Sequence, residues 1–365
     1  MEWMNRKVLV VGTGISGIGA LELLVRKGAN AILYDGNESL IEEDIRKKIQ
    51  IDDQTKIEIV LGELPQNQEM DLIVLSPGVP TDLPWIQKFR ERGIPVWGEI
   101  ELAYQFEQGT ILAITGTNGK TTTTAIAGKI VADYCKKSFV VGNIGIPYTK
   151  TVEGTTKDSI TVGEISSFQL ETIEKFKPKV SSILNITPDH LDRHHNMVNY
   201  IAAKEAITKN QTKDEVCVLN YEDSEAREFA ECCPATVVFF SSKQSLEEGY
   251  YLEEEHIIKV KDGKRETLIN IHEMALLGTH NMENVMAAIA MTDAIGITME
   301  SILQTVRTFQ AVEHRIEFVA TKNGVNYYND SKGTNPDAAM KAVQAMNRKT
   351  IVIGGGYDKE SQYDE

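Results

Sequence analysis

The chain has 365 residues and a formal net charge of −15, with the hydrophobic and charged fractions of an ordinary globular protein, 42% and 25%. The excess of acidic residues argues against nucleic acid as a partner, because nucleic-acid binding relies on Lys and Arg neutralising phosphates. No apolar run approaches the roughly 18 residues of a membrane span, and the four cysteines show no C-x-x-C spacing typical of a zinc site or a disulfide framework. We therefore expect a cytoplasmic protein of two or three domains.

The first part of the chain alternates strand and helix patterns. Residues 7–11, KVLVV, predict a buried strand, residues 18–28 predict a helix that ends at a glycine, and residues 29–35 predict a second strand. A further apolar run at 71–80 ends in a Pro/Gly turn. Alternating strands and helices favour a parallel sheet, so we expect an α/β fold with a Rossmann-like domain over residues 1–108.

A glycine fingerprint lies between the first predicted strand and helix. Residues 12–17, GTGISG, match G-x-G-x-x-G, and Asp35 follows at the end of the second strand. Such glycines permit a tight turn and the close approach of a diphosphate, while the acidic residue binds a ribose hydroxyl. The fingerprint alone leaves open a glycine-rich turn without a ligand and the cofactor site of an NAD-dependent oxidoreductase.

A second glycine loop, ITGTNGKTTTT at residues 114–124, resembles a phosphate-binding loop but is shorter than the usual pattern. G-x-x-x-x-G-K-[ST] requires glycine at position 114, where this chain has Ile114, and the glycine present is Gly116. A strand precedes the loop and a helix is predicted over 121–134. Backbone N–H groups would bind phosphate oxygens, Lys120 the terminal phosphates, and the Thr121 hydroxyl Mg²⁺. The residues expected to contact ATP here are Gly116, Thr117, Asn118, Gly119, Lys120, Thr121 and Thr122.

Further strands and polar clusters follow this loop. We predict strands over 159–166, 179–187, 215–220 and 236–241, a hairpin turning at Asp262-Gly263, a helix over 281–295, and together a central P-loop ATPase-type domain over residues 109–311.

Glu164 ends one of these strands and could deliver a carboxylate to Mg²⁺, and His190 ends another. His190 and His194 have the spacing of a zinc pair, but the H-E-x-x-H pattern is absent, which disfavours a zinc hydrolase. A solvated loop is an equally good interpretation of His194 and His195. The composition of the segment around Lys204 predicts an ordinary lysine on the surface of a helix.

The last part of the chain opens after a boundary near 309–315. Residues 316–330 predict a hairpin turning at Asn323-Gly324, residues 338–346 a helix, and residues 349–359 a buried strand. This unit is small for an independent core. We expect it to be an incomplete C-terminal Rossmann-like domain over residues 312–365.

Together these motifs resemble the Mur ligases, the ATP-dependent amino-acid ligases of peptidoglycan precursor synthesis. The resemblance rests on TGTNGKTT, GEISSFQL, NITPDHLDRH, AAKEAI, THNMENVMAA, EHRIE and NDSKGTNPDA, which span the chain. GTGISG, SPGVP and VWGEIELAY are similar to the branch that adds D-glutamate to UDP-N-acetylmuramoyl-L-alanine. The resemblance implies ATP and Mg²⁺ as cofactors, with these two small molecules as the other substrates.

The resemblance also assigns roles to residues. The UDP-substrate would bind at Gly14, Ile15, Ser16, Asp35, Ser76, Gly78, Asn143, Ser167 and Gln169. ATP would bind at the loop and at Asn281, Asn284, Arg315, Asp330 and Lys332, and D-glutamate at Thr334 and Lys359. The metal ligands would be Thr121, Glu164, His190 and Lys204 as its carbamate, and the catalytic residues Lys120, Glu164, His190 and Lys204.

The implied chemistry is the activation of a carboxylate. The L-alanine carboxylate would attack the γ-phosphate of ATP, and the amine of D-glutamate would then displace phosphate from the resulting acyl phosphate, with no protein nucleophile. The short third domain leaves two alternatives: a non-catalytic protein of this fold that binds UDP-sugar and ATP, and the NAD-dependent oxidoreductase indicated by the first fingerprint.

Overall fold

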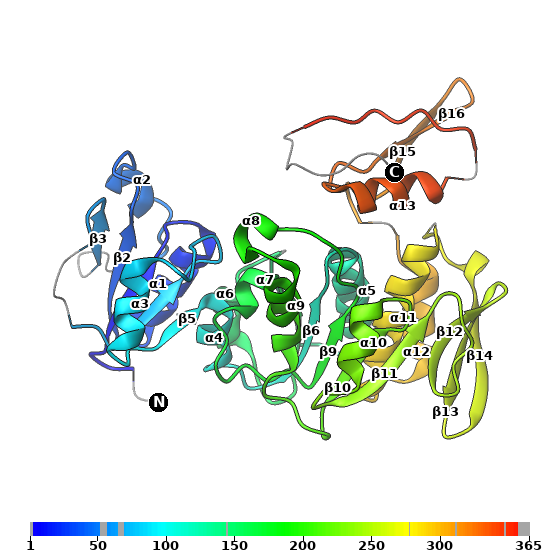
Figure 1. Ribbon diagram of the computed structural model, residues 1–365, viewed down its shortest axis with the longest axis horizontal. Helices are drawn as coiled ribbons and strands as arrows, with labels where there is room; N and C mark the ends of the chain where they lie inside the picture. The colour runs from blue at the N-terminus through cyan, green and yellow to red at the C-terminus, as the bar shows by residue number, and fades with distance from the viewer. Residues whose placement is uncertain are drawn as a thin grey trace.

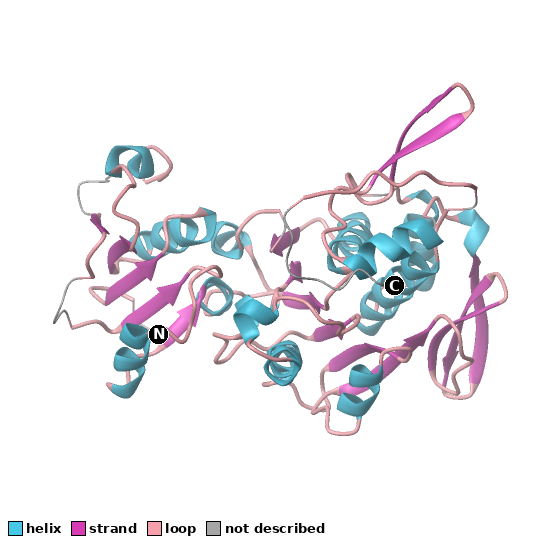
Figure 2. Ribbon diagram, turned by 45° about the horizontal axis from the view of Figure 1, so that its top comes forward, coloured by secondary structure: helices cyan, strands magenta, loops and turns pink. Residues whose placement is uncertain are grey.

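The computed structural model describes residues 3–51, 57–64, 69–143, 145–276, 278–310, 312–346 and 348–356, except for the side chain of Asp337. Three regions follow one another along the chain (Figure 1). In Figure 2 the strands of the two larger sheets form separate groups, with helices packed beside them. Within the described ranges, no helix is long and apolar enough to cross a membrane.

The first region is a five-stranded parallel sheet in the order β3-β2-β1-β4-β5. Its strands are β1 (Lys7–Val11), β2 (Asn30–Asp35), β3 (Glu58–Leu61), β4 (Leu72–Leu75) and β5 (Val96–Gly98), and its helices are α1 (Ile15–Arg26), α2 (Glu42–Arg46), α3 (Pro84–Glu91) and α4 (Glu99–Tyr104). Val8 and Val10 of β1 belong to the core that includes α1, whereas Leu9 and Val11 belong to the core that includes Phe89 of α3. Because both faces of β1 are covered, its apolar residues are continuous. The predicted Rossmann-like arrangement is confirmed.

The central region is a nine-stranded mixed sheet in the order β14-β13-β12-β11-β10-β9-β6-β8-β7. Its strands are β6 (Thr110–Thr115), β7 (Ser138–Gly142), β8 (Ile160–Glu164), β9 (Val180–Ile183), β10 (Val216–Asn220), β11 (Thr236–Ser241), β12 (Gly249–Glu253), β13 (His256–Lys261) and β14 (Lys264–Asn270). Its longer helices are α5 (Lys120–Tyr134), α9 (Met197–Glu205), α11 (Thr279–Ala294) and α12 (Met299–Thr308), and the short ones are α6 (Tyr148–Thr151), η2 (Val152–Gly154), α7 (Ser167–Leu170), α8 (Leu191–His194), η3 (Ala206–Thr208), α10 (Ser224–Ala230) and η4 (Ile271–Glu273).

The position of β6 determines where a ligand can bind. β6 is paired in parallel with β8 on one side and β9 on the other, so the chain leaves β6 where the sheet order reverses. Ligands of open α/β sheets bind at the carboxyl ends of strands at such a point. The predicted hairpin is also confirmed, with Asp262 at φ 52° and Gly263 at φ 69°. The sequence patterns missed the strands β7 and β12.

The first and central regions are joined by a buried contact. The Glu101 carboxylate is fully buried and accepts backbone N–H groups from Glu174, Lys175 and Phe176 at 2.9–3.0 Å. Trp97 Nε1 donates to Glu174 Oε2 at 2.7 Å. These bonds fix α4 against the central region, and they also satisfy a carboxylate that would otherwise be costly to bury.

The C-terminal region contains a hairpin and one helix. β15 (Glu317–Lys322) pairs with β16 (Val325–Asn329) through the predicted turn, and α13 (Pro336–Gln344) follows. Asn335 Nδ2 at the start of α13 donates to Asn118 Oδ1 at 3.2 Å, so this region contacts the central one beside the glycine loop.

The strand predicted over 349–359 is wrong for residues 349–356, which have no regular secondary structure. Ile351 and Ile353 are 91% and 96% exposed. A strand requires partners for its backbone N–H and C=O groups, and within the described residues the hairpin pairs only with itself. The remainder of that prediction lies outside the described residues.

Candidate nucleotide and substrate site

The glycine loop lies between β6 and α5. Gly116 and Gly119 have φ values of 149° and 85°, which favour glycine. A Cβ on Gly119 would lie 2.3 Å from Asn284 Oδ1, and one on Gly116 would lie 3.0 Å from Leu184 Cβ. Both the backbone and the available space therefore require glycine. The loop leads into the N-terminus of the 15-residue helix α5, the arrangement that binds phosphate through free N–H groups.

The segment after β9 holds this loop in place. Thr117 Oγ1 donates to Thr187 O at 3.0 Å and lies 3.0 Å from the Tyr200 hydroxyl. The Asn118 N–H donates to Asn185 Oδ1 at 2.8 Å, and Asn185 Nδ2 donates back to Asn118 O at 3.0 Å. The loop is thus shaped without a ligand, and the Asn118 N–H that the sequence assigned to phosphate is bonded to Asn185 in this structure.

Two lysines converge on one carbonyl of the loop. Lys120 Nζ donates to Gly116 O and Thr117 O at 2.8 Å, and Lys204 Nζ donates to Gly116 O at 2.8 Å. Lys204 is 1% exposed, so it is not an ordinary surface lysine. Burial lowers the pKa of Lys120 and places the pKa of Lys204 well below its ordinary value, with the charge of Lys120 adding to the shift at Lys204. The two side-chain nitrogens thus meet at one carbonyl of the loop, where the charge of Lys120 disfavours a charge on Lys204.

Glu164 ends β8 beside these lysines and is 1% exposed. Its Oε1 accepts Asn143 Nδ2 at 2.8 Å, whereas its Oε2 is buried and has no hydrogen-bond partner among the described residues. A buried carboxylate oxygen without a donor is rare in folded proteins. A cation bound at this oxygen would satisfy it.

His190 lies at the edge of the same site. It is the residue before α8, with a φ of 52°, and its ring packs edge-on against Phe168 at 4.9 Å between centroids. Among the described residues, no three His, Cys, Asp or Glu side chains are gathered closely enough to hold a metal alone. Mg²⁺ commonly takes one or two carboxylates and completes its shell with water and substrate phosphates. The unpartnered Glu164 oxygen fits that mode of binding.

The nucleotide end of the site lies on α11. Asn281 and Asn284 are buried in its first turns, and Asn284 Nδ2 donates to Asn281 Oδ1 at 3.2 Å. Thr123 Oγ1 of α5 donates to Asn284 Oδ1 at 3.2 Å. Asn284 therefore lies against Gly119 of the glycine loop, and Asn281 is joined to Asn284.

The C-terminal residues are only partly gathered at the site. Burial is the largest effect on Arg315 and lowers the pKa of its guanidinium, whereas the negative charges of Asp330 and Glu164 raise that pKa. The positive charge of Arg315 in turn contributes to the lowered pKa of Lys120. Lys332 and Thr334 are exposed. Lys359 lies outside the described residues.

The fingerprint of the first region forms a second cradle. Asp35 Oδ2 accepts the Thr13 N–H at 3.1 Å and its hydroxyl at 2.8 Å, so Asp35 holds the glycine loop in place. Gly14 has open space around its Cα, and Ile15 at the start of α1 is 71% exposed, with Ser16 beside it partly exposed. Ile15 is therefore an exposed apolar residue beside the glycine loop.

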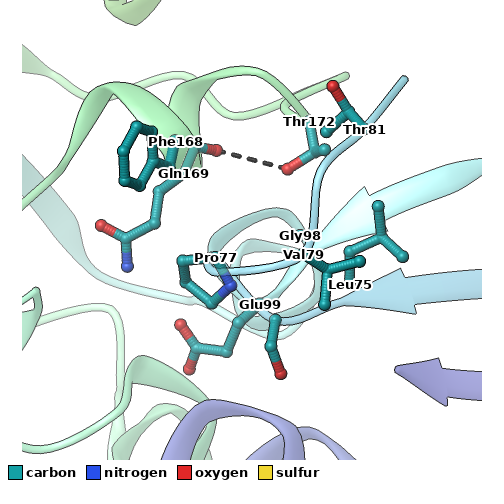
Figure 3. Close-up of a pocket in the computed structure, with 10 residues that line it drawn as sticks. Leu75, Pro77, Val79, Thr81, Gly98, Glu99, Phe168, Gln169 and Thr172 are labelled. Atoms are coloured by element: carbon teal, nitrogen blue, oxygen red, sulfur yellow. Dashed lines mark hydrogen bonds between the residues drawn. The ribbon is translucent and has the colours of Figure 1, made fainter. Parts of the chain in front are cut away.

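A pocket lies between the first and central regions (Figure 3). Its lining residues come from both regions: Leu75, Ser76, Pro77, Val79, Thr81, Gly98, Glu99, Phe168, Gln169 and Thr172. Ser76 Oγ and Glu99 Oε2 are both buried, and neither has a hydrogen-bond partner in the part of the chain that the structure describes. The predicted residues Ser76 and Gln169 thus share one pocket. Gly78 lies in the Ser76 turn with nothing close to its Cα.

The sequence patterns did not predict several residues that lie at the site. Asn185 and Tyr200 hold the loop, Asp189 exerts its charge on both lysines, and Asn335 reaches the loop from α13. Asn185 and Asp189 follow β9, and polar residues after a parallel strand are a usable signal. His194, considered a candidate for a solvated loop, is 4% exposed, whereas the side chain of His195 is 64% exposed.

Comparison with known proteins gives one consistent result. A family model described as the Mur ligase middle domain matches residues 114–292, and one described as the Mur ligase MurD-like N-terminal domain matches residues 6–98. The chain is 55% identical to the UDP-N-acetylmuramoylalanine–D-glutamate ligase of Lachnoclostridium phytofermentans over 367 residues, covering 100% of this chain and 80% of that protein. The enzyme of the same name from Lachnospira eligens is 57% identical, with coverage of 100% and 81%.

Solved structures share the fold. A pseudomurein peptide ligase type C from Methanothermus fervidus matches with a TM-score of 0.55 and 20% identity, over 95% of this chain and 78% of that one. The UDP-N-acetylmuramate-alanine ligase MurC from Thermotoga maritima matches with a TM-score of 0.55 and 22% identity, over 93% and 77%.

Proposed function

The chain belongs to the Mur ligase family, among the UDP-N-acetylmuramoylalanine–D-glutamate ligases, and from that premise we propose how its residues divide the reaction. The reaction joins D-glutamate to UDP-N-acetylmuramoyl-L-alanine at the expense of ATP, in cytoplasmic peptidoglycan precursor synthesis. Because the relatives are ligases, the GTGISG fingerprint is assigned to the UDP-substrate, and the NAD-dependent oxidoreductase is set aside.

The observation that supports this assignment best is the meeting of opposite charges at the end of β6. Lys120 and Lys204 share the Gly116 carbonyl, and Glu164 presents an unpartnered carboxylate oxygen nearby. Three anionic groups must come together when a carboxylate attacks a triphosphate, so the site has to offset their repulsion by positioned charges. This constellation supplies the Lys120 cation for the phosphates, a carboxylate for a metal and, in Lys204, a buried amine that shares the Gly116 carbonyl with Lys120.

We assign the triphosphate to the loop 116–122. When ATP binds, Lys120 exchanges its bonds to Gly116 O and Thr117 O for the terminal phosphates, and the α5 N-terminus faces the phosphate oxygens. Asn281, Asn284, Arg315, Asp330 and Lys332 contact the nucleotide. Arg315 supports this role because its charge already acts within the lysine–carboxylate cluster.

The metal would be held by Glu164, His190, the Thr121 hydroxyl and Lys204 as a carbamate. Bound Mg²⁺ would neutralise phosphate charge and polarise the transferred phosphoryl group. Carbamylation joins the lysine nitrogen to the carbon of CO₂ and releases one proton, which requires the uncharged amine. The lowered pKa of the buried Lys204 favours that form.

We assign the UDP-substrate to the first region and the pocket of Figure 3. Gly14, Ile15, Ser16 and Asp35 take the uridine diphosphate. The rest of the substrate extends from there toward Glu164, to which Asn143 bonds directly. The residues that contact this part of the substrate are Ser76, Gly78, Asn143, Ser167 and Gln169. D-glutamate binds at Thr334 and Lys359. The corresponding units are residues 1–108, 109–311 and 312–365.

Release of phosphate tests this proposal. We expect release only when ATP, Mg²⁺, UDP-N-acetylmuramoyl-L-alanine and D-glutamate are all present. Omitting D-glutamate should leave at most the slow hydrolysis of the acyl phosphate. Measurable binding of the UDP-substrate and ATP without phosphate release would instead support the non-catalytic alternative.

A further inference from the structure

A buried histidine connects the two strand-end loops of the site. His194, the last residue of α8, has its Nε2 3.0 Å from Ser167 Oγ and its Nδ1 3.4 Å from Glu171 Oε1. The three side chains are buried or nearly so, with Ser167 at 3% exposed and His194 at 4%. None of the roles assigned above uses His194 or Glu171.

The carboxylate determines the direction of this chain of hydrogen bonds. An ionised carboxylate only accepts hydrogen bonds, so the neutral imidazole carries its proton on Nδ1, facing Glu171. Nε2 is then an acceptor, and the Ser167 hydroxyl donates to it. Each partner therefore has a single orientation, as in the outer shell of many metal sites.

His194 and Ser167 brace the two loops that carry the proposed metal ligands. Ser167 is three residues after Glu164, and His194 is four residues after His190. Phe168 reinforces the brace, because its ring lies 4.9 Å from the His190 ring and 5.5 Å from the His194 ring. The bond between His194 and Ser167 therefore helps to fix how far apart Glu164 and His190 lie.

The same network reaches the first region. Glu171 Oε2 accepts the Thr81 hydroxyl at 3.2 Å and Arg193 Nη2 at 2.8 Å, and Arg193 Nη2 also donates to Val79 O at 2.9 Å. Thr81 and Val79 belong to the segment after β4 that carries Ser76 and lines the pocket of Figure 3.

We propose that His194 is a positioning residue that couples binding of the UDP-substrate at the segment 76–81 to the spacing of the metal-ligand loops. The proposal rests on the proposed function. The segment 76–81 is joined to the Glu164 and His190 loops by one set of polar contacts, through Glu171, His194 and Ser167. A substrate that fixes the segment 76–81 therefore also fixes Glu171, His194 and Ser167. Without His194, the Ser167 hydroxyl loses the acceptor that orients it. Glu171 keeps its bonds to Arg193 and Thr81 but is no longer joined to Ser167 and the loops that carry Glu164 and His190.

The test uses His194→Phe, which keeps a planar ring of similar size but removes the hydrogen bond to Ser167 and the polar contact with Glu171. We expect the Mg²⁺ concentration for half-maximal activity to rise about 10-fold, the lower end for lost outer-shell partners of a metal site. The affinity for UDP-N-acetylmuramoyl-L-alanine, measured by calorimetry without ATP or Mg²⁺, should also fall. Affinity for ATP without Mg²⁺ should change less than about 2-fold, because Asn185 and Thr187 hold the glycine loop independently of His194.

The matched control is His272→Phe, since His272 is an exposed histidine that pairs only with Glu255 among the contacts described, at 3.0 Å, outside this network. His194→Gln should recover part of the lost affinity, because its amide can still bond to Ser167. If His194→Phe fails to fold, Thr81→Val cuts the network at its first-region end without entering the core.

A double-mutant cycle separates coupling from loss of structure. If the network acts as one unit, Thr81→Val and His194→Phe together should weaken UDP-substrate binding no more than His194→Phe alone. Unchanged UDP-substrate affinity and Mg²⁺ dependence in His194→Phe would overturn the proposal, and so would equal losses of ATP and UDP-substrate affinity. If the unmodified chain itself binds no UDP-substrate, it is the proposed function that fails.

Discussion

Replacement of Gly119 by alanine tests how tightly the glycine loop is built. Gly119 has a φ of 85°, and its new Cβ would lie 2.3 Å from Asn284 Oδ1 and 3.3 Å from Leu184 Cδ1. The left-handed backbone costs about 1–2 kcal/mol for a residue with a Cβ. Asn284 cannot move away freely, because Thr123 and Asn281 both bond to it, so overpacking adds about 1–3 kcal/mol.

Gly324→Ala is the matched control for this change. Gly324 has a φ of 79° at the tip of the β15–β16 hairpin, and nothing lies within 4 Å of its new Cβ. It therefore carries the backbone cost without the collision. The difference between the two variants isolates the crowding against Asn284.

The assay combines thermal unfolding with ATP binding. We expect the free energy of unfolding of Gly119→Ala to be about 1–3 kcal/mol lower than that of Gly324→Ala. For a domain of this size, each kcal/mol lowers the melting temperature by roughly 2–4 °C. Its ATP affinity should fall, while that of Gly324→Ala should not change. Equal stabilities and equal ATP affinities in the two variants would refute the inference that this loop is closely packed against α11.

Three further outcomes are expected. Lys120→Ala should abolish ATP-dependent phosphate release. Its affinity for the UDP-substrate, measured by calorimetry, should stay within about 2-fold of the unmodified chain, because distant sites respond independently. Equal loss of phosphate release and UDP-substrate affinity would contradict the separation of the two sites. Gly14→Ala should leave the melting temperature unchanged, since nothing lies within 4 Å of its Cβ position, yet should weaken UDP-substrate binding if a diphosphate lies there; unchanged affinity would remove the diphosphate from this loop. Burial raises the pKa of the Glu99 carboxyl in the folded chain. The protonated carboxyl therefore contributes stability below the ordinary carboxyl pKa, and this contribution is lost as the pH rises through the folded-state pKa. Glu99→Gln, which can still accept both bonds from Thr149, should therefore raise the melting temperature more near neutral pH than at about pH 4, and a pH-independent change would contradict this account.

The sequence patterns were most reliable where local chemistry alone sets the conformation. Asp262-Gly263 and Asn323-Gly324 both form the predicted hairpin turns, because their left-handed backbone depends only on the residues themselves. The strand predicted near Ile351 failed for the opposite reason. An apolar run becomes a strand only when another strand lies beside it, and within the described residues none does.

The amino-acid sequence by itself determined the two glycine loops, their flanking strands and helices, and the family, since each depends on the order of residues along a short segment. Only the tertiary structure decided which distant side chains meet. Lys204 and Lys120 are 84 positions apart in the chain, yet they share the Gly116 carbonyl. His194 looked like part of a solvated loop, yet it is buried against Ser167 and Glu171. Sequence spacing reports contacts within one helix or turn, whereas these contacts arise because parallel strands bring their carboxyl ends to one edge of a sheet.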